Sequence, residues 1–155
     1  MTAFRIRPGV ASDGEQLSRL LQALWPDASS QEHLEEVMPI LCDKPPGMLP
    51  AVIFVAETKT GELAGFLEAG LRSHADGCDV RQPVGFIEGW FVVETHRRKG
   101  AGAQLLAAAE NWARGHGCIE MASDTWIDSS LSQKVHQALK YEVVDRCVHY
   151  RKQLY

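Results

Sequence analysis

Apolar residues recur at two spacings along the chain: every second position, which is typical of a strand, and every three to four positions, which is typical of a helix. The changes from one spacing to the other predict where the strands and helices lie. Residues 4–7 alternate between apolar and polar and end at Pro8-Gly9, which indicates a short first strand. Leucines recur at helical spacing from Leu17 to Leu24, which predicts an amphipathic helix. The same reasoning predicts further strands at about 51–56, 63–71, 84–93, 119–124, 141–144 and 147–151, and further helices at about 30–41, 102–114 and 130–139. We therefore expect an α/β (α+β) fold with a mixed central sheet of about seven strands, flanked by about four helices.

The stretch from Trp90 to Ala113 is the most informative part of this pattern. An apolar strand ends at Val93, three basic residues (97–99) stand directly before Gly100-Ala101-Gly102, and a helical pattern follows. The first turn of a helix has unpaired N–H groups and the positive end of the dipole, and glycines let a phosphate approach the backbone closely. We expect a phosphorylated ligand here, lying back along the preceding strand. The alternative is a solvated basic turn before an ordinary helix.

The composition of the chain limits the classes of ligand and the cellular location that we expect. The chain has 155 residues, 45% of them hydrophobic, and a net charge of −4, which argues against a general nucleic-acid binder and is compatible with a cationic small molecule. Its cysteines are far apart, so neither metal ligation nor a disulfide framework is expected: Cys42, Cys78, Cys118 and Cys147. We expect a single domain over residues 1–155, in the cytoplasm, with no metal and no membrane partner.

Two carboxylates stand where an amine could bind. Glu88 lies inside an apolar strand beside Gly89, and Asp124 follows another strand at its carboxyl end, where ligands bind in α/β sheets. On adjoining strands the two would form an acidic pocket that favours a cationic guest. The alternatives are a buried carboxylate satisfied inside the fold for Glu88, and a turn or capping role for Asp124.

The motif at residues 97–102, Arg-Arg-Lys-Gly-Ala-Gly, resembles the R/Q-x-x-G-x-G/A signature of the GNAT superfamily of acyl-CoA N-acyltransferases. The predicted order of strands and helices is similar to that of the superfamily over nearly the whole chain. Segments 22–26, 76–79, 86–92, 121–125, 132–139 and 150–152 are similar to aminoglycoside 6′-N-acetyltransferases. This resemblance implies transfer of an acetyl group from acetyl-CoA to the 6′-amino group of an aminoglycoside, by direct attack in a ternary complex, in a resistance enzyme that is a homodimer.

The resemblance also implies roles for individual residues. Acetyl-CoA would be bound by Trp90, Phe91, Val92, Arg97, Arg98, Lys99, Gly100, Ala101, Gly102, Ala103 and Ser129. The aminoglycoside would be bound by Trp25, Asp76, Asp79, Glu88, Asp124 and Asp145, the last of these in the partner subunit. Asp124 and Glu88 would act on the amine.

The family's tyrosine acid is replaced in the pattern by Val135-His136, so His136 is a candidate acid for the leaving thiolate. A structural histidine is the equal alternative, and coenzyme A can leave without an acid. Two other functions stay open: an acetyltransferase for another amine, such as a polyamine, an amino sugar or a peptide N-terminus, and a non-catalytic acyl-CoA sensor or antibiotic-binding module.

Overall fold

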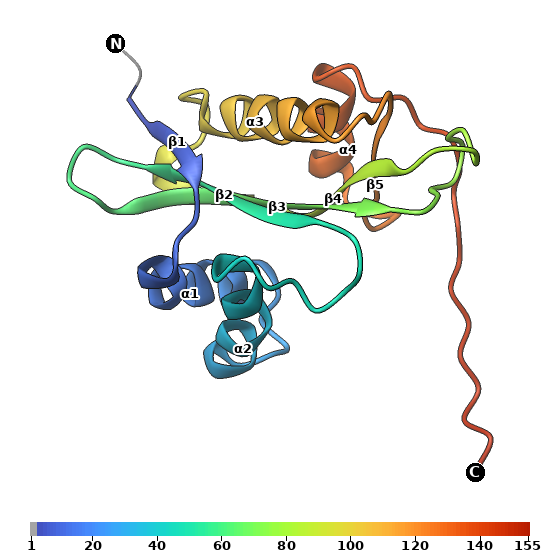
Figure 1. Ribbon diagram of the computed structural model, residues 1–155, viewed down its shortest axis with the longest axis horizontal. Helices are drawn as coiled ribbons and strands as arrows, with labels where there is room; N and C mark the ends of the chain where they lie inside the picture. Colours follow the sequence, from blue (N-terminus) through green and yellow to red (C-terminus); the bar gives the residue numbers. More distant parts are fainter. Residues whose placement is uncertain (1–2) are drawn as a thin grey trace.

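A computed structural model describes residues 3–155 as a sheet covered by helices on both faces (Figure 1). The strands follow one another across the sheet in chain order, antiparallel throughout except for the last pair, which is parallel. They are β1 (Arg5–Pro8), β2 (Ala51–Glu57), β3 (Leu63–Arg72), β4 (Val84–Val92) and β5 (Met121–Ser123). The helices are α1 (Gly14–Leu24), α2 (Ser30–Leu41), α3 (Ala101–Gly115) and α4 (Ser130–Ala138), with 3₁₀ turns at Ala11–Asp13 and Glu94–His96.

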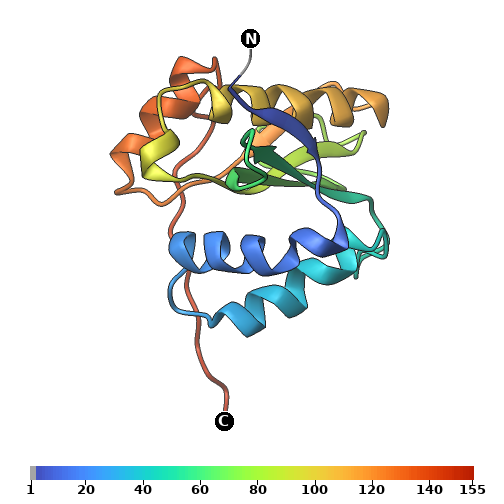
Figure 2. The ribbon, with the colours of Figure 1, turned by 90° about the vertical axis from the view of Figure 1, so that its left-hand side faces the viewer.

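Two apolar cores separate the three layers (Figure 2). On one side α3 packs Leu105 and Ala109 against Leu67 and Ile87 of the sheet. On the other side α1 and α2 pack against a different set of strand residues, which includes Val55 and Phe66. Because successive strand residues point to opposite faces, Phe66 faces α1 and α2 while its neighbour Leu67 faces α3.

A bulge interrupts this alternation in β4. Glu68 of β3 is opposite Gly89 and Ala69 is opposite Ile87, so Glu88 is an extra residue on the β4 side. Ile87 and Trp90 consequently both pack on the α3 side. Gly89 instead faces α1, where an added Cβ would lie 2.7 Å from the Trp25 indole. The bulge therefore directs residues 88–89 toward the α1–α2 side of the sheet.

β5 is much shorter than its neighbour. It pairs with β4 only from Gly85–Met121 to Ile87–Ser123. Beyond Ile87, β4 keeps its antiparallel partner β3 on one edge, but its other edge has no strand beside it. The main chain from Glu88 to Val92 is thus open along that edge.

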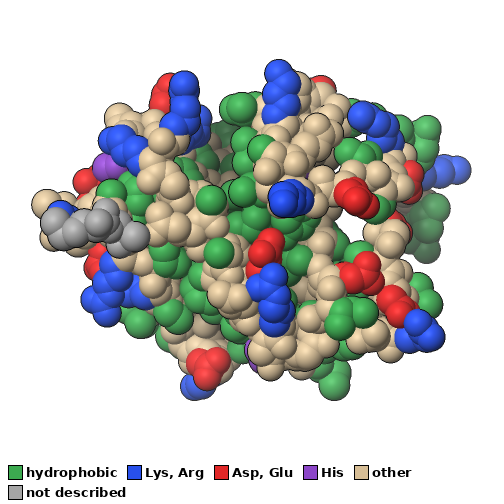
Figure 3. Space-filling view, turned by 90° about the horizontal axis from the view of Figure 1, so that it is seen from above, with side chains coloured by type: hydrophobic (Ala, Val, Ile, Leu, Met, Phe, Trp, Pro, Cys, Tyr) green, Lys and Arg blue, Asp and Glu red, His purple; other side chains and the backbone are tan. Residues whose placement is uncertain are grey.

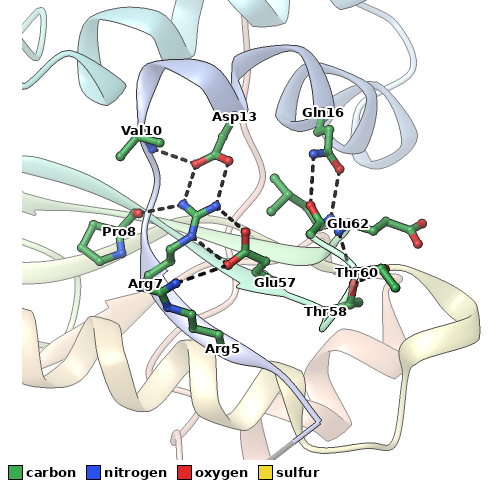
Figure 4. A network of polar contacts seen from close by, with 12 residues as sticks. Arg5, Arg7, Pro8, Val10, Asp13, Gln16, Glu57, Thr58, Thr60 and Glu62 are labelled. Atoms are coloured by element: carbon green, nitrogen blue, oxygen red, sulfur yellow. Dashed lines mark hydrogen bonds and ion pairs between the residues drawn. The ribbon is translucent and has the colours of Figure 1, made fainter.

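An ion-pair network fixes the start of the chain (Figure 4). Arg7 of β1 donates two hydrogen bonds to Asp13, at 2.7 and 3.0 Å, and two more to Glu57 of β2. Asp13 also accepts the Val10 N–H, and the Arg7 guanidinium holds the Asp13 pKa below its usual value. The network joins β1, β2 and the entry to α1, the helix that carries Trp25 at its end.

The last two predicted strands are absent from the described chain. Residues 139–155 form no helix or strand, and the terminal segment runs away from the sheet (Figure 1). The prediction of an α/β fold with four helices is confirmed, but the prediction of about seven strands is wrong: the sheet has five. A strand needs a neighbour to bond, and in the described chain the terminal segment lies beside none of the five strands. In the described part of the chain no helix is long and apolar enough to cross a membrane.

Candidate active site

The amino end of α3 has the features of an anion site. Gly100 caps the helix with φ +88°, in the left-handed region that favours glycine, and contributes no side chain that would bond the first N–H groups. The first turn also contains no acidic residue, and residues 97–99 are exposed beside it. These groups fit a diphosphate, as the sequence predicts.

Trp90 joins this turn to the open edge of β4. Its indole lies beside Gly102, where an added Cβ would be 3.4 Å from the ring, an ordinary van der Waals contact. Arg97 donates from Nε to the Val92 carbonyl at 2.8 Å, which ties the basic turn to the end of β4. A ligand bound at the α3 amides can therefore extend along the main chain of Trp90–Val92.

Around this helix the surface carries charges of both signs. Figure 3, which views the α3–α4 side, shows Lys and Arg side chains interspersed with Asp and Glu. No continuous basic surface covers this side of the described chain. The anion site is therefore a local feature of the glycine turn and not part of a broad basic face.

Glu88 and Asp124 lie on the same side of the sheet. Ser123 is opposite Ile87, so the next residue on each strand brings Asp124 beside Glu88, on the face away from α3. Both carboxylates raise the pKa of Arg72, which places that guanidinium close to each of them. A cation that the sequence analysis did not include thus lies near both acids.

Arg72 binds Glu88 through both of its carboxylate oxygens. Nε donates to Oε1 at 2.9 Å and Nη2 donates to Oε2 at 2.8 Å, a bidentate geometry. The guanidinium carbon also lies 3.5 Å from the centre of the Phe86 ring. Arg72 ends β3 and could have been found from the sequence only with the register of β3 against β4.

Glu68 is a second residue of this face that the sequence analysis missed. It lies on β3 opposite Gly89, is mostly buried, and forms no hydrogen bond or ion pair with any described residue. Burial, and then the charges of Glu88 and Glu36, raise its pKa to about 7. The sequence contains a signal for Glu68 of the same kind as for Glu88, because each is an acidic residue inside an apolar strand.

Trp25 lies on the same face as Glu88, against Gly89. It follows α1, and its indole covers Gly89. The buried His33 of α2 donates from Nε2 to the Trp25 carbonyl at 2.9 Å, and the two rings are 6.4 Å apart. The position of Trp25 is therefore fixed by contacts on both helices.

His136 lies on the opposite, α3-facing side. Its Nδ1 donates to the Ser132 carbonyl at 2.7 Å, so its Nε2, 2.9 Å from the Ser123 hydroxyl, accepts from that group. The ring packs edge-on against Trp90 and Tyr141. Both nitrogens are thus used within the fold, where they join α4 to β5.

Four other predicted residues lie apart from Glu88 and Asp124. The carboxylate of Asp79 binds Arg81, and the Asp79 N–H donates to Glu120. Glu120 precedes β5, whereas Asp124 follows β5 at its other end. Asp76 belongs to the same exposed loop. Asp145 is in the terminal segment and accepts from its neighbour's N–H, and Ser129 begins α4. Within one chain these residues do not join the acidic pair.

Comparison with known proteins agrees with this geometry. Residues 15–141 match the acetyltransferase (GNAT) family, and the chain belongs to that family. An aminoglycoside N(6′)-acetyltransferase type 1 of Klebsiella aerogenes is 39% identical over 149 residues, which cover 96% of each chain. The solved structure of AAC(6′)-Iy with a bisubstrate analogue, CoA-S-monomethyl-acetylneamine, matches with a TM-score of 0.86 at 37% identity, over 97% of this chain and 98% of that one. AAC(6′)-Ih from Acinetobacter baumannii matches with a TM-score of 0.85 at 30% identity, over 98% and 99% of the two chains.

The raised pKa of Glu68 predicts a pH-dependent stability. A carboxyl with a pKa of about 7 folded and 4.5 unfolded binds more protons in the folded state between these pH values, so stability falls as the pH rises through this window. Glu68→Gln removes the titration with little change in shape. Urea unfolding should therefore find the variant more stable than wild type at pH 8, by about 1–3 kcal/mol, and this difference should shrink toward pH 4.5. Glu62→Gln, in the exposed β2–β3 turn, is the control, and equal stabilities of Glu68→Gln and wild type at both pH values would show that Glu68 is solvated.

Proposed function

We propose that this protein transfers the acetyl group of acetyl-CoA to the 6′-amino group of aminoglycoside antibiotics and so confers resistance to them. The observation that carries the proposal is one arrangement: a helix end whose first N–H groups are bonded by no side chain, a strand edge without a neighbouring strand in the described chain, and the acids Glu88 and Asp124 near that edge. The identity to named aminoglycoside N(6′)-acetyltransferases over nearly the whole chain supports the choice of acceptor. A cytoplasmic location stays a prediction.

Each part of the site has a proposed task. The α3 amides and the basic turn bind the diphosphate of acetyl-CoA, which supplies an activated acetyl group. N–H groups of the open β4 edge are available to the thioester carbonyl oxygen as charge develops on it. Glu88 and Asp124 bind the ammonium groups of the acceptor. Asp124 takes one proton from the 6′ ammonium group, and the freed lone pair then attacks the acetyl carbon while the carbon–sulfur bond breaks. The second proton of the nitrogen passes through water to the departing thiolate.

The protonation of the departing thiolate needs no residue of this chain, because a thiol is a fair leaving group. His136 was a candidate acid, but both of its ring nitrogens already have partners in the fold. This supports the structural alternative for His136. Its place beside Trp90 still lets it support the wall of the cofactor path.

A spectrophotometric assay of thiol release over a panel of amines tests the proposal. Kanamycin and tobramycin should be acetylated, and NMR of the products should place the new amide at the 6′ nitrogen. Strong turnover of polyamines or amino sugars with none of either antibiotic would instead identify an acetyltransferase for another amine. Binding of acetyl-CoA and antibiotic without any product would identify a binding module.

Asp124→Asn tests the proposed base and clamp. The amide keeps the size of the side chain but removes its charge and its ability to accept a proton, so kcat/KM should fall on the order of 10²- to 10⁴-fold. Asp128→Asn, an exposed change in the same β5–α4 loop, is the matched control. Turnover by Asp124→Asn at the wild-type rate would remove Asp124 from the mechanism.

We also propose that the protein is a homodimer formed through its terminal segment. Residues 142–155 are exposed and form no strand in one chain, although they carry several large apolar side chains, among them Val148, Tyr150 and Leu154. β5 is the last strand of the sheet, so its outer edge has no partner either. A second copy would cover both features. It would also give Asp145 a route to a site in the partner.

Light scattering of the eluting protein checks this arrangement. The full chain should have the mass of two copies, and a chain truncated after Tyr141 should have the mass of one. Val148→Asp should weaken the dimer because it places a charge among the covered apolar residues, whereas Val80→Asp, equally exposed in the loop before β4, should not. A dimer that survives the truncation would show that other surfaces form it.

A further inference from the structure

Arg72 is held on two sides at the mouth of the acidic face. Its fork binds both oxygens of Glu88, and its plane lies over the Phe86 ring. All three residues are on the α1–α2 side of the sheet, because Phe86 and Glu88 are two positions apart on β4. A guanidinium with contacts of this kind on two sides is a fixed part of the site.

The groups around Arg72 are mostly acidic. Glu88 comes from β4, Asp124 follows β5, Glu68 comes from β3, and Glu36 comes from α2, where His33 is 3.7 Å from it. Repulsion within this group shows in Glu68, whose pKa is raised in part by Glu88 and Glu36. The positive charge of Arg72 offsets this repulsion for the two acids that it faces.

The pair does not prevent Glu88 from binding an acceptor. A carboxylate offers about four lone pairs, and the fork of Arg72 uses two of them. The Glu88 side chain is 35% exposed, so its remaining lone pairs are open to solvent. A carboxylate whose orientation is already fixed loses less freedom when an ammonium binds to it.

We propose that Arg72 is a positioning residue of the acceptor site, which fixes the orientation of the Glu88 carboxylate. This rests on the proposed function, because it concerns the binding of an amine. Two properties of one side chain are involved, its fork geometry and its charge. Lysine retains the charge without the fork, and methionine retains neither.

Steady-state kinetics of variants separate these properties. For Arg72→Met, we expect KM for tobramycin to rise about tenfold, the loss of roughly one charge-assisted hydrogen bond, with KM for acetyl-CoA unchanged. Arg72→Lys should restore little of this loss, because an ammonium group cannot form the two-armed contact with Glu88. Arg19→Met, which removes an exposed arginine of α1, is the control for net charge.

Other results would overturn the proposal. A fall in KM for Arg72→Met would show that the guanidinium blocks the acceptor. Full recovery of KM in Arg72→Lys would show that the fork geometry does not matter. A rise of KM for acetyl-CoA equal to the rise for tobramycin in Arg72→Met would reduce Arg72 to a structural role.

A second measurement does not depend on activity. In NMR of the ¹⁵N-labelled protein, the Arg72 Nε–H should exchange slowly with water, and Glu88→Gln should abolish this protection. If the wild-type protein releases no thiol with any amine, the proposed function is wrong. The exchange rate of the Arg72 Nε–H then tests by itself whether Arg72 positions Glu88. Protection lost in Glu88→Gln supports the positioning of Glu88, and an unprotected Nε–H overturns it.

Discussion

The site depends on the unequal pairing of β4 with its two neighbours. β3 bonds one edge of β4 along its length, whereas β5 bonds the other edge over three residues. Where β5 ends, main-chain groups that a sheet would normally satisfy are left for a ligand. The bulge at Glu88 lies at the same point and turns a carboxylate and a glycine toward the face that Trp25 covers. One local feature thus supplies both the strand edge proposed for the cofactor and the acidic face proposed for the acceptor.

The acidic residues on the proposed acceptor face favour the binding of a cation, but they do not stabilise the protein in the absence of a ligand. Glu68 is mostly buried without a partner, and its pKa of about 7 records the cost of ionising it there. Arg72 compensates the outer acids, Glu88 and Asp124, but forms no bond to Glu68. Uncompensated acids of this kind are tolerated at functional sites because a charged ligand relieves the repulsion when it binds.

Local features of the sequence were enough for much of this account. The glycine turn after β4 and the acids Glu88 and Asp124 each stand out through a residue type that conflicts with its pattern; the turn precedes α3, and both acids lie near Arg72. Glu68 and Arg72 could not be assigned, because their roles depend on the register across β3 and β4 and on a one-residue bulge. The prediction of two terminal strands was wrong for a different reason. The sequence pattern indicates that a segment can pair as a strand, but it does not indicate whether the segment lies beside another strand of the same chain.

The central claim is that the cofactor binds at the end of α3 and along the open edge of β4. Titration of ¹⁵N-labelled protein with coenzyme A tests it most directly, through the shifts of individual amide signals. The account predicts the largest shifts at Gly100, Gly102 and Trp90. Another hollow, of about 670 Å³, lies beside β1 and is lined by Phe4, Glu57 and Lys59 among others. Shifts centred on those residues, with Gly100 and Gly102 unmoved, would contradict the account.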